Sequence, residues 1–289
     1  MFRRMTNEEE NGVRSKLAKI EPQNTTVEVT VPINIALIKY WGKRDENLVL
    51  PLNDSLSFTI DSLFARTTVS IESIKDDAQR GDEVTINGKT VDLRKNSRFG
   101  KVFDEARKLL YNSSDNNGSN ANSNIVFKVD SRTNFPVAAG LASSAAGFAA
   151  IAFAIKQLLS LSDDDACRLA RIGSGSACRS MCGGLAHWRA GVLVNGVDSI
   201  SVSRFPSSHW PSLRCIIVIF NEREKDTGST VGMQRTVQTS SLLKRRIQYL
   251  TEASWALIRA IHNFNDKQNE VRAAYSFDAG PNACVFMER

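Results

Sequence analysis

PVAAGLASSAAGFAA, residues 136–150, is the stretch that decides which fold this sequence predicts. Gly140 and the serine pair Ser143 and Ser144 come just before a run of small apolar residues, a pattern typical of a turn that opens a buried helix. Backbone N–H groups gathered at such a helix start can hold a phosphate. The alternative is a tight turn that only caps the helix. The stretch alone leaves both interpretations open, so the rest of the chain has to decide.

Two familiar phosphate-binding loops are excluded for this stretch. The glycine is not followed by the lysine of the pattern G-x-x-x-x-G-K-[ST]. The protein-kinase pattern is missing too, because no G-x-G comes before a strand and no H-R-D follows.

A second unusual stretch, NIALIKYWGKRDE (34–46), gathers cations and aromatic side chains in one short turn. Lys39 and Lys43 could simply lie on a solvated surface. Equally, two cations beside the hydroxyl of Tyr40 suit a diphosphate, because phosphate oxygens accept charge-assisted hydrogen bonds.

Two further stretches, GSGSACRS (173–180) and FDAGPNACVF (277–286), also place polar groups at glycine turns. In the first, hydroxyl groups and the guanidinium of Arg179 together make a carboxylate or phosphate site. In the second, Asp278 comes before a Gly-Pro turn, where it either caps the turn or acts as a catalytic carboxylate at a rigid strand end. Four such stretches in one chain favour a binding site over four independent structural turns.

The composition is that of a globular chain with a mildly basic balance. The 289 residues carry a formal net charge of +6, with 42% hydrophobic and 24% charged residues. The charge suits an anionic small substrate, and no basic run interleaved with aromatic residues indicates nucleic-acid binding. No apolar run is long enough to span a membrane, and the charged N-terminus lacks the apolar core of a signal peptide. We therefore expect a cytoplasmic protein without membrane contact.

Metal-binding and redox sites are not indicated. The five cysteines contain no C-x-x-C pair, and the three histidines are not spaced like zinc ligands. We expect structural cysteines and no metal ion bound directly by the protein.

Strands and helices follow one another without regular βαβ order, which predicts an α+β fold of two lobes. We expect a flexible leader over residues 1–26, a first lobe over 27–190 and a second lobe over 191–289. Asn87-Gly88 is the strongest hairpin signal, and Ser162 with Asp165 three residues later predicts a helix start. The expected strands include 25–38, 56–61, 65–74, 125–131 and 214–220, and the expected helices include 97–111, 163–172, 241–250 and 254–264.

Together these motifs resemble the GHMP kinase superfamily and, within it, the mevalonate diphosphate decarboxylase family. The segments that carry the resemblance stand in that family's order: NIALIKYWGKRD, LNDSLSFTID, NFPVAAGLASSAAGFAA, GSGSACRS, GSTVGM and FDAGPNA. They cover the chain from about residue 27 onward. The resemblance implies a two-lobed GHMP-kinase-like fold, with a ribosomal protein S5 domain 2-like first lobe, a ferredoxin-like second lobe and an active-site cleft between them.

The resemblance also implies residue roles. Asp278 would orient a tertiary hydroxyl and take its proton. Arg179, with Asn34 nearby, would hold the substrate carboxylate, and Lys39 would stabilise charge near the transferring phosphoryl group. The residues implied to bind the substrate, chiefly its diphosphate, are Tyr40, Trp41, Lys43, Ser174, Ser176, Ser229 and Thr230, in addition to Arg179. Those implied to hold the ATP phosphates are Gly140, Leu141, Ala142, Ser143 and Ser144.

The reaction that the resemblance implies is the ATP-dependent decarboxylation of mevalonate 5-diphosphate to isopentenyl diphosphate, with release of ADP, phosphate and carbon dioxide. Mg²⁺ would enter with ATP, and the enzyme would be a homodimer. The alternatives are a small-molecule kinase of the same superfamily, a decarboxylase of the 5-monophosphate, and a non-catalytic binding protein on the same scaffold.

The chain departs from the family pattern at one internal place. Members of the family carry further helices between segments like 241–250 and 251–264, whereas here Leu250 runs directly into Thr251. Family chains also usually continue beyond CVFMER. Either the second lobe is shortened, or the sequence lacks residues at this place.

Overall fold

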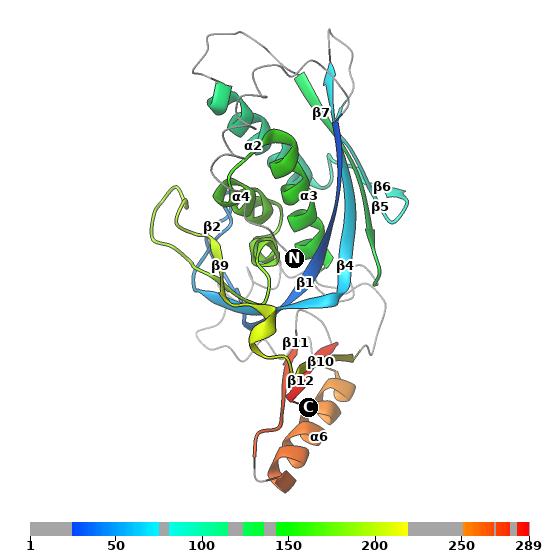
Figure 1. The fold of residues 1–289 in the computed structure, drawn as a ribbon, viewed down its shortest axis with the longest axis vertical. Coiled ribbons are helices and arrows are strands. Elements are labelled where there is room, and N and C mark those ends of the chain that lie inside the picture. Colours follow the sequence, from blue (N-terminus) through cyan, green and yellow to red (C-terminus); the bar gives the residue numbers. More distant parts are fainter. Residues whose placement is uncertain are drawn as a thin grey trace.

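The structure is a computed structural model that describes residues 25–74, 81–114, 124–135, 143–218, 251–268, 270–277 and 282–288. It has a large sheet covered by helices on one face and a smaller sheet with one helix beside it (Figure 1). The expected α+β fold is therefore confirmed. Nearly all of the expected leader, 1–26, lies outside the described residues.

The larger sheet has seven strands in the order β6-β5-β7-β4-β8-β9, with β1 paired to the other edge of β4. β4 is paired with β1 along most of its length, with β8 near its start and with β7 in its second half. The strands are β1 (Thr25–Ile38), β4 (Ser55–Ile74), β5 (Glu83–Ile86), β6 (Lys89–Thr90), β7 (Asn124–Thr133), β8 (Leu185–Trp188) and β9 (Ser201–Phe205). A separate two-stranded ribbon consists of β2 (Lys43–Asp45) and β3 (Leu50–Pro51).

β4 corrects one expectation, because the segments 56–61 and 65–74 form one strand of 20 residues instead of two. The pairing with β1 shifts register here: Ile33 pairs with Ile60, but its neighbour Pro32 pairs with Phe64. A β-bulge takes up the extra residues in a continuous strand, whereas a turn would have ended the strand.

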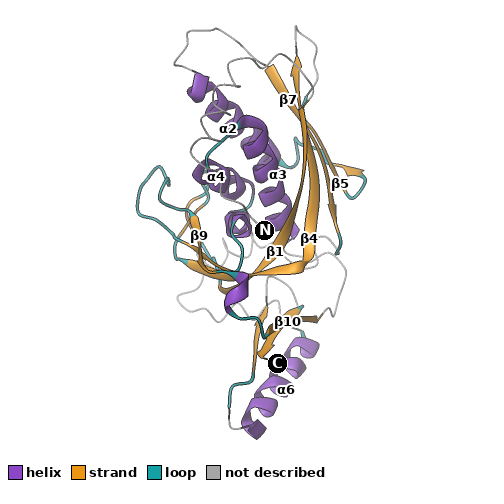
Figure 2. Ribbon diagram, viewed as in Figure 1, coloured by secondary structure: helices purple, strands orange, loops and turns teal. Residues whose placement is uncertain are grey.

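The helices α2 (Ser97–Ser114), α3 (Ser143–Leu159) and α4 (Asp163–Gly173) lie on one face of this sheet (Figure 2). Most of the side chains of α3 are buried, including a run of alanines that lets the helix approach the sheet closely. The helix that the opening stretch predicts is therefore present, and it begins at Ser143. The predicted start of α4 is confirmed as well, because the Ser162 hydroxyl accepts a hydrogen bond from the Asp165 N–H at 3.1 Å.

The predicted hairpin between β5 and β6 is also confirmed. Asn87 and Gly88 have φ angles of 48° and 77°, and the tight two-residue turn needs positive φ at both positions.

The smaller sheet has the order β10-β12-β11, with β10 (Leu213–Val218), β11 (Ala273–Phe277) and β12 (Ala283–Glu288). The helix α6 (Glu252–Gln268) packs against it. Cys284 and Phe286 of β12 lie in one buried cluster with Ile33 and Ile35 of β1, so the two sheets share apolar contacts.

The lobe boundary after residue 190 stays a prediction. β9 comes later in the chain but is paired with β8 in the larger sheet. We propose that the change of lobe occurs between Phe205 and Leu213, where β9 ends and β10 begins.

Candidate active site

The centre of the candidate site is the buried guanidinium of Arg179, which is only 4% exposed. Arg179 lies in the short helix η2 (Gly175–Met181) that follows α4. Its Nε donates a hydrogen bond to the side-chain oxygen of Asn34 at 3.0 Å, and its Nη1 donates to the hydroxyl of Ser55 at 3.0 Å. The structure thus brings together Arg179 and Asn34, which are 145 residues apart in the sequence.

Asn34 is itself held in place by η2. Its Nδ2 donates to the Ser180 hydroxyl at 2.6 Å and to the Ser176 carbonyl oxygen at 3.2 Å. Asn34 is 1% exposed, and its side-chain oxygen and nitrogen both have partners. A fully bonded polar network of this kind keeps a buried cation in one orientation.

Tyr40 lies against the start of η2. A Cβ atom added at Gly175 would come within 2.8 Å of the Tyr40 ring, so only glycine permits this close packing. The ring also packs on Trp188, with 4.8 Å between the ring centroids. Burial raises the pKa of the Tyr40 phenol well above its usual range, and the charge of Arg179 acts on it in the opposite direction. Tyr40 is therefore a neutral hydrogen-bond donor at neutral pH.

The Tyr40 hydroxyl oxygen is buried and has no hydrogen-bond partner among the residues that the structure describes. Buried hydroxyl groups normally have a partner, and an exception calls for an explanation. A donor of this kind beside a helix start suits an anionic ligand.

The beginnings of α3 and η2 meet through two serines. The hydroxyl groups of Ser144 and Ser174 lie 3.2 Å apart, although the residues are 30 positions apart. Ser143 and Ser174 are half-buried and Ser144 is exposed, so these hydroxyl groups are accessible at the N-terminus of α3. A helix N-terminus carries partial positive charge and unpaired N–H groups, and both favour phosphate.

The remaining predicted residues of the 34–46 stretch follow directly after β1. Lys39 and Trp41 are half-buried. Lys43 is the first residue of β2 and pairs with the carboxylate of Glu46 at 2.6 Å, with 10% of its side chain exposed. A diphosphate on Lys43 would have to compete with this carboxylate.

Arg171 stabilises the part of the site that contains Lys43, a role that the sequence did not indicate. Its side chain is fully buried in α4, and its guanidinium donates to the Leu48 carbonyl at 3.1 Å and to the Gly196 carbonyl at 2.9 Å, with a third bond to the Ser199 carbonyl. Leu48 lies in the turn between β2 and β3. The arginine therefore ties the ribbon that carries Lys43 to α4.

Several predicted site residues lie outside the described part of the chain, namely Gly140, Leu141, Ala142, Ser229, Thr230 and Asp278. The strand that precedes Asp278 is nevertheless anchored near Arg179. Ser276 of β11 donates a hydrogen bond to the carbonyl of Ala36 at 2.8 Å, and Ala36 is two residues from Asn34 on β1.

The expected structural role of the cysteines stays a prediction, which the burial of three of them supports. Cys167 and Cys178 are buried in a cluster with Trp188. Burial raises the pKa of the Cys178 thiol and raises that of Cys182 to about 12. Both thiols are therefore protonated at neutral pH and are poor nucleophiles. Among the described residues, no group of three or more His, Cys, Asp and Glu side chains is placed to hold a metal ion.

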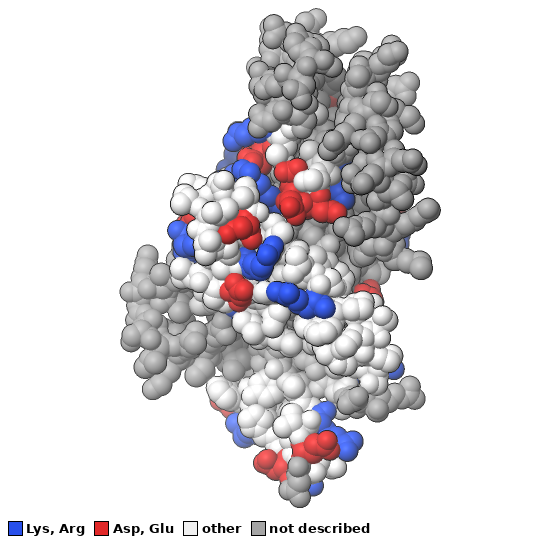
Figure 3. Space-filling view, turned by 60° about the vertical axis from the view of Figure 1, so that its left-hand side comes forward, with Lys and Arg blue, Asp and Glu red and all other residues white. Residues whose placement is uncertain are grey.

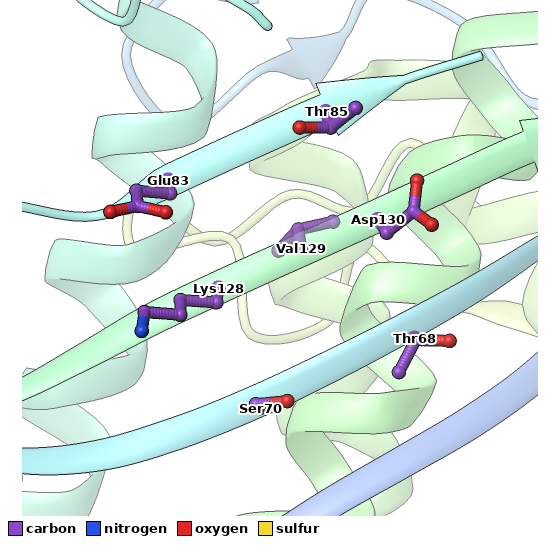
Figure 4. Close-up of a pocket in the computed structure, with 7 residues that line it drawn as sticks. All are labelled: Thr68, Ser70, Glu83, Thr85, Lys128, Val129 and Asp130. Atoms are coloured by element: carbon purple, nitrogen blue, oxygen red, sulfur yellow. The ribbon is translucent and has the colours of Figure 1, made fainter. Parts of the chain in front are cut away.

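Other described surfaces carry weaker evidence for a binding site. A depression of about 220 Å³ lies over β4, β5 and β7, lined by Thr68, Ser70, Glu83, Thr85, Lys128, Val129 and Asp130 (Figure 4). None of these residues belongs to the Arg179 network. The face in Figure 3 mixes cations and anions, so the net charge does not gather there into a basic patch. No described helix is long and apolar enough to cross a membrane.

Comparison with known families agrees with this geometry. Residues 31–201 match the family model of the diphosphomevalonate decarboxylase-like N-terminal domain. The model of the mevalonate 5-diphosphate decarboxylase C-terminal domain matches 215–248 and 245–289, two segments that overlap at residues 245–248.

Individual proteins are similar over most of their length. The diphosphomevalonate decarboxylase of Rattus norvegicus is 37% identical over 318 positions, covering 93% of this chain and 78% of the relative. The human enzyme is 38% identical, covering 90% and 76%. The structure of mevalonate diphosphate decarboxylase from Trypanosoma brucei has a TM-score of 0.78 at 32% identity, covering 91% of this chain and 80% of that one.

A fourth similar protein has a described ligand set. The structure "MDDEF in complex with MVAPP, AMPPCP and Magnesium" has a TM-score of 0.74 at 29% identity and covers 92% of this chain and 90% of that chain. The neighbours carry the two-lobed fold of the GHMP kinases, which confirms the expected fold class. On the strength of its matching domains and relatives, this chain belongs to the diphosphomevalonate decarboxylase family.

Proposed function

We propose that this chain catalyses the ATP-dependent decarboxylation of mevalonate 5-diphosphate to isopentenyl diphosphate, with ADP, phosphate and carbon dioxide as the other products. The observation that carries the proposal is the buried guanidinium of Arg179, held in one orientation by Asn34 and Ser55 beside the serines at the start of α3. Family membership names the reaction, and this geometry supplies the means to hold its anionic substrate.

The substrate's two anionic ends would occupy different parts of the site. Arg179 suits the carboxylate, because a planar guanidinium can donate two parallel hydrogen bonds to it. Tyr40 suits the diphosphate, because its hydroxyl is a buried neutral donor without a described partner. Further partners proposed for the diphosphate are Trp41, Lys43, Ser174, Ser176, Ser229 and Thr230.

ATP would bind with its phosphates at the N-terminus of α3. The helix is 17 residues long, and its first residues, Ser143 and Ser144, offer hydroxyl groups next to its N–H groups. Gly140, Leu141 and Ala142 precede them in the sequence. Mg²⁺ commonly keeps several waters and is held by phosphates and one or two protein oxygens. The serine hydroxyl groups fit that role, and the ion would neutralise charge on the phosphates.

The chemistry starts at the tertiary hydroxyl of the substrate. A hydroxyl group is a poor leaving group, so it first becomes a phosphate ester at the expense of ATP, a step that depends on positioning and charge stabilisation. Asp278 would orient this hydroxyl and take its proton, while Lys39 would stabilise the transferring phosphoryl group. When the phosphate leaves, positive charge develops next to the carbon that bears the carboxylate. Carbon dioxide departs, and its bonding electrons form the alkene.

Product analysis tests this proposal against its alternatives. The purified chain is incubated with ATP and Mg²⁺ and either mevalonate 5-diphosphate or the 5-monophosphate, and carbon dioxide, ADP and the isoprenoid product are measured. We expect one carbon dioxide and one isopentenyl diphosphate per ADP from the 5-diphosphate. ADP without carbon dioxide would instead indicate a kinase, carbon dioxide only from the 5-monophosphate a different specificity, and neither product a binding protein.

Assembly and location are further proposals that rest on the family resemblance. We propose a homodimer that works in the cytoplasm. Light scattering after gel filtration tests the first point, and fractionation of cells that express the tagged full chain tests the second.

A further inference from the structure

Ser55 holds one side of the Arg179 guanidinium. It is the first residue of β4 and is fully buried. Its hydroxyl donates a hydrogen bond to the Ile38 carbonyl at 2.6 Å and accepts one from Arg179 Nη1 at 3.0 Å. A serine hydroxyl has a single proton, and the bond to Ile38 uses it. The oxygen that faces Arg179 can therefore act only as an acceptor.

These two acceptors, Asn34 and Ser55, lie on different strands and bond to different nitrogens of the guanidinium. Asn34 on β1 accepts from Nε, next to the aliphatic part of the side chain. Ser55 on β4 accepts from Nη1, at the outer end of the planar group. Since all five N–H groups of a guanidinium lie in one plane, fixing two of them sets the direction of the others.

We propose that Ser55 is a positioning residue, which aims the Arg179 guanidinium at the carboxylate of the substrate. The role deepens the proposed function and rests on it, because it takes Arg179 as the carboxylate-binding group. Ser55 acts through Arg179 and touches no reacting atom. The loss of ligand affinity on removal of the Ser55 hydroxyl should therefore depend on whether the ligand has a carboxylate.

Ser57 offers a matched control on the same strand. Two residues along a strand, it lies on the same face as Ser55, and it is also fully buried. Its hydroxyl oxygen has no hydrogen-bond partner among the described residues. Ser55→Ala and Ser57→Ala each delete one fully buried hydroxyl from β4, but only the first breaks described hydrogen bonds, those to Arg179 and to the Ile38 carbonyl.

The experiment compares two ligands by calorimetry, with the full-length chain. Mevalonate 5-diphosphate has both a carboxylate and a diphosphate, whereas isopentenyl diphosphate has only the diphosphate. In Ser55→Ala we expect the affinity for mevalonate 5-diphosphate to fall about tenfold or more, because a guanidinium that is no longer aimed at the carboxylate loses about one charge-assisted hydrogen bond to it. Affinity for isopentenyl diphosphate should stay within about twofold, and Ser57→Ala should leave both affinities within about twofold. Ser55→Thr, which keeps the hydroxyl, should restore most of the loss.

Two results would overturn the proposal. If Ser55→Ala matches Ser57→Ala for both ligands, Ser55 does not position Arg179. If Ser55→Ala lowers the affinity for both ligands equally, the Ser55 hydroxyl acts through its hydrogen bond to the Ile38 carbonyl instead. Should Ser55→Ala not fold, Ser55→Cys replaces it, since a thiol is a far weaker acceptor. A wild-type chain that binds mevalonate 5-diphosphate without releasing carbon dioxide contradicts the proposed function, yet the binding comparison still decides the role of Ser55. A chain that does not bind it contradicts both.

Discussion

The two ends of the candidate site differ in how many of their buried polar groups have hydrogen-bond partners within the protein. At the proposed carboxylate end, formed by Asn34, Ser55 and Arg179, buried side chains bond to one another at 3.0 Å. At the proposed diphosphate end, which includes Tyr40 and Ser174, the buried Tyr40 hydroxyl has no described partner, and the Ser174 hydroxyl lies 3.2 Å from Ser144 of the proposed ATP site.

This difference indicates how each end of the site would bind its part of the substrate. The carboxylate end is built before any ligand arrives, which reduces the ordering cost of binding. The diphosphate end contains a donor whose burial is unfavourable until a ligand accepts its hydrogen bond. Changes at the first end should therefore affect both stability and activity, and changes at the second should affect binding alone.

The largest effect is expected at Asp278, which we propose as the group that takes the proton of the tertiary hydroxyl. Asp278→Asn keeps the side-chain shape and removes the charge. Positioned proton transfer contributes typically about 10²–10⁴-fold, so turnover should fall by that range while ATP binding and the melting temperature are retained. Steady-state kinetics, ATP titration and thermal unfolding of one preparation measure all three. If Asp278 only caps a turn, the melting temperature will drop and turnover per folded molecule will persist.

Arg179→Lys tests the carboxylate end. An ammonium group cannot bond to Asn34, Ser55 and a carboxylate in the geometry of a guanidinium, so kcat/KM for the substrate should fall about 10- to 100-fold. The melting temperature should fall too, because two buried acceptors lose their donor. Arg94→Lys is the control, since the Arg94 side chain is 95% exposed. Kinetics of Arg179→Lys equal to those of the control would remove Arg179 from the site.

Tyr40→Phe tests the diphosphate end and should separate binding from stability. The lost hydroxyl has no described partner, so the free energy of unfolding should stay the same or rise by about 1 kcal/mol. Affinity for mevalonate 5-diphosphate should nevertheless fall about tenfold. Tyr275→Phe provides the comparison, because that hydroxyl lies 3.1 Å from His262 Nε2. If Tyr40→Phe lowers stability but does not weaken substrate binding, the Tyr40 hydroxyl does not bind the diphosphate.

The smallest effect concerns Cys182, which follows η2 at the carboxylate end. Its pKa is raised by burial to about 12, above the value in the unfolded chain, so the folded state retains a proton that the unfolded state releases. The contribution of this thiol to stability is therefore complete below pH 8.5 or so and is lost as the pH rises toward 12. Urea unfolding from pH 8 to 10 should show a shallower decline for Cys182→Ser than for the wild type, with unchanged kcat at pH 7. If the free energy of unfolding declines equally with pH in both proteins, the pKa of the Cys182 thiol is not raised by folding.

Local signals predicted those features that depend on a few neighbouring residues. The Asn87-Gly88 turn and the Ser162 cap each need only the chemistry of adjacent residues, and both are present. The change from a glycine turn to small apolar residues predicted a helix, and the structure begins that helix, α3, at Ser143. The long strand β4 was not predicted, because a bulge and a turn look alike in sequence.

Tertiary partners could not be predicted in the same way. Arg179 and Asn34 were expected near one another only through the family resemblance, whereas Ser55, Ser180 and Arg171 had no assigned role. Ser55 lay within the LNDSLSFTID motif, which was the one available signal for it. Arg171 reads as an ordinary arginine on an amphipathic helix, and only folding surrounds it with carbonyl groups.

One sequence was enough to predict the family, many of the helices and strands and the types of chemical group at the site. Those properties follow from residue type and from spacing along the chain, which a single sequence records. The folded chain was needed to show that Arg179 is held by two strands, that Tyr40 packs on Gly175 and that β9 belongs to the larger sheet. A hydrogen bond or a close contact depends on distance in space, and residues more than 120 positions apart meet only when the strands have paired.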